Sequence, residues 1–264
     1  MNVTADGFEV KRHNKVPPVL LSFWIVKILS TTVGETVADS LAVDLGLGLY
    51  KTSIACLAIL TFLLFWQFRS RRYVPSLYWP VVVLVSIVGT QLTDILTDKL
   101  DVSLRLSSAA FAVLLTSMFL IWQRVEGTLA IESINTPRRE AFYWAAILCT
   151  FALGTAGGDL ATEDFGIGFR LGSLVFMGAI ACVSVAYRLG ANRILAFWTA
   201  YILTRPLGAA LGDLLSQSRE FGGLGFGAKA TSLVFLSVIL VFVVIEQRSF
   251  RGGVQERTSL PIHP

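Results

Sequence analysis

The sequence contains very few of the residues on which metal, nucleophilic and redox chemistry usually depend. It has two histidines, His13 and His263, and both lie near the ends of the chain. Its three cysteines, Cys56, Cys149 and Cys182, form no Cys-x-x-Cys pair. A buried zinc or copper site is therefore not expected. P-loop, nucleophile-elbow, zinc-protease and Rossmann motifs are also missing, so we expect neither an enzyme nor an ATP-driven pump.

Charge is scarce as well. Charged residues make up 15% of the 264 residues and hydrophobic residues 54%, whereas soluble domains carry about 25% charged residues. A helix that crosses a bilayer core of about 30 Å needs about 20 apolar residues. The chain has six charge-free stretches of 16 to 21 residues, at 52–68, 73–93, 106–123, 141–158, 171–187 and 230–245. These stretches predict an integral membrane protein whose partner is the lipid bilayer.

One motif occurs four times in the same register. An aromatic residue is followed by Trp, a Gly comes ten residues after the Trp, and an Asp comes five residues after the Gly. The four copies are Phe23-Trp24, Gly34 and Asp39; Tyr78-Trp79, Gly89 and Asp94; Tyr143-Trp144, Gly154 and Asp159; and Phe197-Trp198, Gly208 and Asp213. Such a period indicates a fold built from internal repeats.

Each repeat continues into a second apolar segment after a short turn, so the sequence predicts an all-α polytopic membrane protein with eight transmembrane helices. We expect four parallel two-helix repeats, at about 18–72, 73–127, 138–191 and 192–246, around a pseudo-fourfold axis. The first helix of each repeat would line the interior and the second would face lipid. The predicted helices are 18–41, 50–68, 74–97, 105–122, 141–162, 170–188, 193–215 and 227–246.

The basic residues predict the orientation. Fourteen Lys and Arg residues lie in the links between repeats and in the tails, 1–17 and 247–264, against six in the turns within repeats. The positive-inside rule then places both tails in the cytoplasm, in a bacterial plasma (inner) membrane. This placement also accounts for the net charge of +4 without a nucleic-acid partner; a homo-oligomer is left open. The aromatic-Trp pairs are expected to form an interfacial belt at the cytoplasmic end.

Charges inside the predicted helices mark the candidate site. A charge near the bilayer centre is costly and usually faces the bundle interior. We therefore expect seven residues to act together: Glu35, Asp39, Asp94, Asp159 and Asp213 as ligands of a proton or of a divalent cation such as Mn, Mg or Ca, and Arg205 and Lys27 as counter-charges.

The leading hypothesis is a transporter of a small cation, either a divalent metal or a cation coupled to protons, through a central acidic site. The runner-up is a non-transporting membrane scaffold or sensor, in which the buried acids only lock helices together. A membrane enzyme acting on a lipid or a quinone is the weakest alternative, because no nucleophile or redox ligand set is visible.

The motif resembles a bacterial family of integral membrane proteins that is defined by a repeat of unknown function. The resemblance rests on Gly34-Glu35-Thr36-x2-Asp39, Gly89-Thr90-x3-Asp94, Gly154-Thr155-x3-Asp159 and Thr204-Arg205-Pro206-Leu207-Gly208-x4-Asp213. It covers about residues 18–246 and implies a transmembrane fold, but no substrate.

Overall fold

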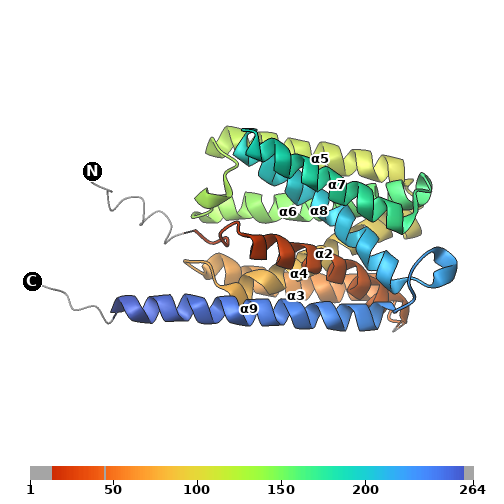
Figure 1. Cartoon of the computed structure of the whole chain (residues 1–264), viewed down its shortest axis with the longest axis horizontal. Coiled ribbons are helices and arrows are strands. Elements are labelled where there is room, and N and C mark those ends of the chain that lie inside the picture. Colours follow the sequence, from red (N-terminus) through yellow and green to blue (C-terminus); the bar gives the residue numbers. More distant parts are fainter. Residues whose placement is uncertain (1–13, 45, 259–264) are drawn as a thin grey trace, which may run out of the picture.

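The computed structural model describes residues 14–44 and 46–258, and in these residues the chain forms eight α-helices and no strand. The helices run side by side along one long axis (Figure 1). Their bounds are Leu21–Asp39 (α2), Leu49–Arg69 (α3), Pro75–Asp94 (α4), Leu104–Glu126 (α5), Pro137–Asp159 (α6), Gly168–Arg188 (α7), Arg193–Ser216 (α8) and Ala228–Thr258 (α9). They agree with the predicted helices to within a few residues, except that α9 extends past residue 246.

Seven of these helices, α3 to α9, are long and apolar enough to cross a membrane. The remaining one, α2, has 19 residues, which is about 28 Å of helix at about 1.5 Å per residue. It is not among these seven, and Lys27 and Glu35 interrupt its apolar sequence. Both charges are buried by neighbouring helices, so α2 is an internal helix of the bundle.

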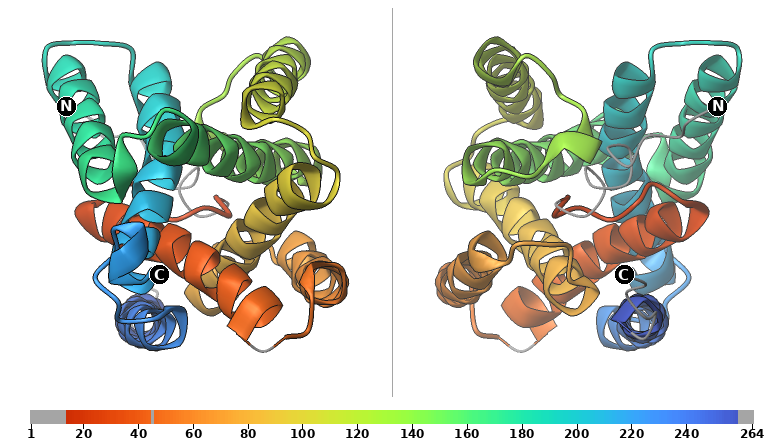
Figure 2. Two further views of the ribbon diagram at one scale, coloured as in Figure 1. Left: turned by 90° about the vertical axis from the view of Figure 1, so that its right-hand side faces the viewer. Right: turned by 90° about the vertical axis from the view of Figure 1, so that its left-hand side faces the viewer.

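The first helices of the four repeats form a closed inner ring. Helix α2 packs on α4, α4 on α6, α6 on α8, and α8 on α2, and Figure 2 shows these four helices tilted across one another around a common centre. In their apolar segments, 56% of α4, 67% of α6 and 56% of α8 is buried, against 11 to 22% of the outer helices α3, α5, α7 and α9. This confirms the predicted division into inner and outer helices.

The outer helices connect neighbouring repeats. Helix α3 packs on α4, α5 on α6, α7 on α8, and α9 returns to pack on α2. Each outer helix thus lies mainly against the inner helix of the next repeat. The repeats interlock, and no single repeat buries its own apolar surface.

The turns within repeats depend on residues with a left-handed backbone. Gly46 and Gly166 occupy the same place in the first and third repeats, with φ of 62° and 69°. In the second repeat this place belongs to Asp101, which has φ of 52°. Glycine adopts this conformation without steric cost, and Asp tolerates it better than most residues. The turn predicted from the glycines is therefore present even in the copy that lost them.

The aromatic-Trp pairs do not form the predicted interfacial belt. Phe23 is 2% exposed and Tyr78 and Tyr143 are 0% exposed, and the hydroxyl groups of the two tyrosines share a hydrogen bond inside the ring. The aromatic residue lies eleven positions before the motif Gly, three turns along the same helix face. That face points into the ring, so these side chains close the interior at the end where α2 begins.

Three inner helices change their winding directly after the motif Asp. Asp39, Asp94 and Asp159 are the last residues of α2, α4 and α6, and each is followed by five residues of π-helix, Ser40–Asp44, Ile95–Lys99 and Leu160–Asp164. In the fourth repeat, α8 continues past Asp213 to Ser216. Local π-helix is rare and frequently occurs at functional sites.

Candidate functional site

The motif glycines set the spacing of the inner ring. At each of the four helix crossings, a Cβ atom added to the glycine would lie closer than 3.0 Å to the residue three positions before the glycine of the next inner helix. Only glycine fits such a close approach, as in other small-residue helix contacts in membranes. The four contacts are Gly34 with Ser86, Gly89 with Phe151, Gly154 with Arg205, and Gly208 with Thr31.

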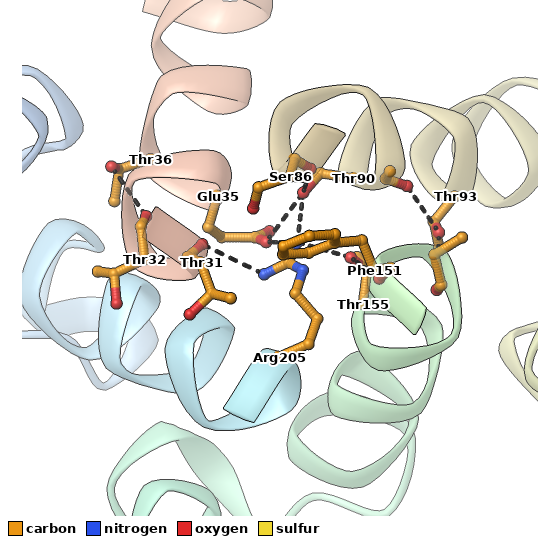
Figure 3. Close-up of polar contacts among 12 residues, drawn as sticks. Thr31, Thr32, Glu35, Thr36, Ser86, Thr90, Thr93, Phe151, Thr155 and Arg205 are labelled. Atoms are coloured by element: carbon orange, nitrogen blue, oxygen red, sulfur yellow. Dashed lines mark hydrogen bonds and ion pairs between the residues drawn. The ribbon is translucent and has the colours of Figure 1, made fainter. Parts of the chain in front are cut away.

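These contacts bring one position of every repeat toward the same centre, and in the fourth repeat that position is Arg205. Its side chain is 0% exposed and forms an ion pair with Glu35, with Nη2 2.7 Å from Oε2. The same nitrogen donates a hydrogen bond to Thr155 Oγ1 at 2.6 Å and another to Thr90 Oγ1, while Nη1 donates to the carbonyl oxygen of Thr31 at 3.4 Å. Figure 3 shows the guanidinium group among these partners.

All four inner helices therefore contribute to one buried polar site. Glu35 comes from α2, Thr90 from α4, Thr155 from α6 and Arg205 from α8. Glu35, Thr90 and Thr155 each follow the motif glycine directly, whereas the fourth repeat has Ala209 at that position. Glu35 is 7% exposed, and Thr90 also donates to its Oε2 at 3.4 Å. The pair forms because repeats one and four differ from the common pattern at positions that face each other.

A second cation lies one turn closer to the aromatic end of the ring. Lys27 is 1% exposed, and its Nζ lies 4.2 Å from the ring centroid of Phe151 and 4.3 Å from that of Tyr201. Phe151 also contacts the guanidinium of Arg205, whose Cζ is 5.8 Å from the ring centroid. In the described part of the chain, Lys27 Nζ, Arg205 Nε and the Tyr201 hydroxyl have no hydrogen-bond partner. The site thus holds two cations and one carboxylate in an apolar surrounding.

The four motif Asp residues lie on the other side of the ion pair, away from the aromatic end. They follow Glu35 and its equivalents by four residues, which is about 6 Å along a helix. Asp39, Asp94 and Asp159 are half-buried and Asp213 is 7% exposed. Sequence reasoning treated Glu35 and the four Asp residues as one set, but the structure separates them into a deep carboxylate and a shallower layer.

The five acids do not form the cluster of ligands that was expected of a metal site. Among the described residues, no group of three or more His, Cys, Asp or Glu side chains could hold a metal ion. Mg, Mn and Ca take most of their ligands from several oxygen atoms at once. The divalent cation stays a prediction, without support from a clustered ligand set.

Two further parts of the site were not predicted from the sequence. Phe151 and Tyr201 surround Lys27, and they occupy the same repeat positions as Arg205 and Lys27 respectively, three and seven residues before the glycine. A second buried pair lies near the start of α2, where Lys15 Nζ is 2.5 Å from Oε2 of Glu140. An alignment of the four repeats would have indicated the two aromatic residues, because equivalent positions of the repeats meet at the centre of the ring.

Comparison with protein families gives the same repeat. The family described as Repeat of Unknown Function (DUF347) matches residues 22–73, 77–128, 142–191 and 196–251. The chain belongs to this family. The match confirms the four repeats, and with the apolar helices it indicates an integral membrane protein with four copies of the family's repeat. Searches of curated proteins and of solved structures gave no match.

Proposed function

We propose that this protein transports protons, or a small cation coupled to protons, along the centre of the inner ring, with Glu35 as the binding carboxylate. The observation that carries the proposal is the buried pair of Glu35 and Arg205, which draws on all four repeats. In the proposed architecture all eight helices cross the membrane around a pseudo-fourfold axis. Both chain ends face the cytoplasm of a bacterial cell.

The chemistry follows from the competition for one carboxylate. In the arrangement described here Arg205 neutralises Glu35. A proton or a cation that binds Glu35 would take over this role, and Arg205 would keep Thr155 and the Thr31 carbonyl as hydrogen-bond acceptors. In the empty site the positive charge of Arg205 balances the carboxylate of Glu35, and in the occupied site the bound proton or cation does so. Binding is therefore coupled to movement of the guanidinium group away from Glu35. A single carboxylate with hydroxyl neighbours suits a proton better than a divalent ion.

Two features favour one direction of access. The aromatic layer and Lys27 close the side where α2 begins, whereas three of the motif Asp residues, Asp39, Asp94 and Asp159, are partly exposed on the opposite side. Asp98, Glu163 and Asp164 are exposed beyond them. A surface lined by acids raises the local concentration of cations. We therefore propose that the site is open toward the acidic, outer side in this conformation.

The alternative function is that of a scaffold or sensor whose charges only join helices. Replacing a buried ion pair by neutral groups is often neutral or stabilising, so stability alone gives little reason to keep two cations and a carboxylate in the membrane. This argument favours transport.

Proton flux into liposomes tests the proposal. Purified protein is reconstituted with a pH-sensitive dye inside, and a pH gradient is applied with valinomycin and potassium to clamp the voltage. We expect the wild type to dissipate the gradient, Glu35→Gln to lower the flux at least about tenfold, and the control Glu132→Gln, at an exposed acid in the link that precedes α6, to match the wild type. Equal flux from Glu35→Gln and wild type contradicts the proposal.

A further inference from the structure

A groove lies in the flank of the molecule, away from the central site. It has a volume of ≈ 640 Å³ and lies between α2, α7 and α8, beside the link that precedes α6. This size is within the range of about 300–1,000 Å³ that small-molecule sites occupy. Its walls are mainly apolar, and include Trp24, Ile28, Ile180, Val183 and Phe197.

The groove lies where the third repeat departs from the second. Arg105-Leu106-x-Ser108 at the start of α5 aligns with Arg170-Leu171-x-Ser173 at the start of α7, which pairs Phe119 with Ser184 and Trp122 with Tyr187. In α5, Phe119 and Trp122 pack against Trp198 of α8, with ring centroids 4.9 and 5.7 Å from that of Trp198.

On α7 the same place is left open. Ser184 bonds only to the carbonyl oxygen of Ile180 in its own helix, at 2.8 Å, and Tyr187 is 51% exposed. Trp24, the repeat equivalent of Trp198, borders the groove together with both residues. The corresponding tryptophan of α4, Trp79, is engaged by Glu246 of α9, with Nε1 3.1 Å from Oε2. Thus side chains of α5 and α9 contact Trp198 and Trp79, whereas the small Ser184 of α7 leaves space beside Trp24.

The length of the groove matches half of a bilayer. Along α8 it extends from Arg193 to Thr204, which is eleven residues or about 17 Å of helix. The hydrocarbon core of a bilayer is about 30 Å thick, so one leaflet measures about 15 Å. An acyl chain of one leaflet therefore has the right length to fill the groove.

The mouth of the groove carries positive charge, which is complementary to a lipid phosphate. Arg188 and Arg193 line it at the end of the molecule where the links between repeats lie, and both are exposed. Arg193 is held by Glu132, with Nη2 2.5 Å from Oε1, whereas no ion pair involves Arg188 among the described residues. Arginine side chains at this level bind phosphate groups of lipids.

We propose that this groove is a binding site for one anionic phospholipid, with an acyl chain along α7, α8 and Trp24 and the headgroup phosphate at Arg188 and Arg193. The site is independent of ion transport through the ring. Its inner end reaches Thr204, whose carbonyl oxygen accepts a hydrogen bond from Thr31 Oγ1 at 3.3 Å. A bound lipid thus lies directly behind the crossing of α2 and α8 that positions Arg205.

Native mass spectrometry of delipidated protein in detergent, titrated with phosphatidylglycerol or phosphatidylcholine, tests the proposal. We expect one phosphatidylglycerol to bind the wild type, and more tightly than phosphatidylcholine. Ser184→Phe copies the side chain that fills this place in α5 and should abolish binding. The control Val185→Phe adds the same ring at a 56% exposed position outside the groove and should bind as the wild type does.

Arg188→Gln leaves the groove open and should weaken binding of phosphatidylglycerol about tenfold, as expected for loss of one charged hydrogen bond. This variant decides the question even if Ser184→Phe fails to fold. Unchanged binding by Arg188→Gln, equal binding of the two lipids, or binding that survives in folded Ser184→Phe overturns the proposal. Each result is separate from the flux of Glu35→Gln, so the lipid site and the transport site can fail independently.

Discussion

The pair of Glu35 and Arg205 makes a quantitative prediction about stability. Arg205→Gln leaves the Glu35 carboxylate buried, with only hydroxyl neighbours, and Glu35→Gln leaves the guanidinium without a counter-charge. Removing one partner of a buried ion pair costs about 3–5 kcal/mol. For a chain of this size, that corresponds to a midpoint of thermal unfolding roughly 6–20 °C lower.

The double variant Glu35→Gln/Arg205→Gln should recover most of this loss. Both charges are then gone, and the two amides can hydrogen-bond to each other and to Thr90 and Thr155. We expect stability within about 2 kcal/mol of the wild type, because a neutral replacement of a buried pair is often tolerated. The coupling between the two sites in a double-mutant cycle would then be at least about 4 kcal/mol, above the range of about 0.5–3 kcal/mol usual for residues in contact.

Thermal unfolding in detergent at pH 7, followed by circular dichroism, measures the cycle. The double variant Arg105→Gln/Asp164→Asn serves as the control, since this pair is exposed, with Arg105 Nε 3.0 Å from Asp164 Oδ2, and exposed pairs are worth about 0–1 kcal/mol. Single variants of the buried pair that each stay within about 1 kcal/mol of the wild type would refute the reasoning.

Three further predictions concern the rest of the ring. Gly154→Ala should lower the unfolding midpoint more than Gly157→Ala on the same helix, because only the first added methyl group meets a neighbour, the side chain of Arg205; equal melting curves would show that the crossing is loose. Lys27→Met should be at least as stable as the wild type in the same assay, because it removes a buried ammonium without a hydrogen-bond partner; a loss of more than about 2 kcal/mol would mean that the two aromatic rings compensate this charge fully. Asp94→Asn and Asp159→Asn should leave the fold intact but remove any shift of the midpoint caused by millimolar Mn or Mg, and a wild type without such a shift would count against a divalent cation.

Much of the fold followed from periodicity. The spacing of Trp, Gly and Asp repeats because each inner helix makes the same crossing with the next one, so the four inner helices and their buried face could be predicted. The sequence could not decide whether the aromatic residues form an interfacial belt, since an aromatic side chain at a helix end suits both lipid headgroups and a closed interior. Only the ring geometry, in which Phe23 and Tyr78 face inward, decides between them.

The arrangement of the candidate site residues could not be predicted from the sequence. Glu35 and Arg205 were identified because charges inside apolar helices are rare, yet their pairing depends on which inner helices are neighbours. The separation of Glu35 from the Asp layer is one helical turn, which a set of acids in a sequence does not reveal. The groove beside α7 arises from Ser184 standing where α5 has Phe119, and its meaning depends on the contact that the phenylalanine makes in the fold.

The double variant Glu35→Gln/Arg205→Gln, reconstituted in liposomes, gives the most direct test of the proposed transport site. It is expected to fold as the wild type does, so a loss of flux cannot be attributed to a loss of structure. We predict that this folded variant no longer dissipates a pH gradient while Glu132→Gln still does. Flux at the wild-type rate from the double variant would show that the buried pair only joins helices, and would contradict the account.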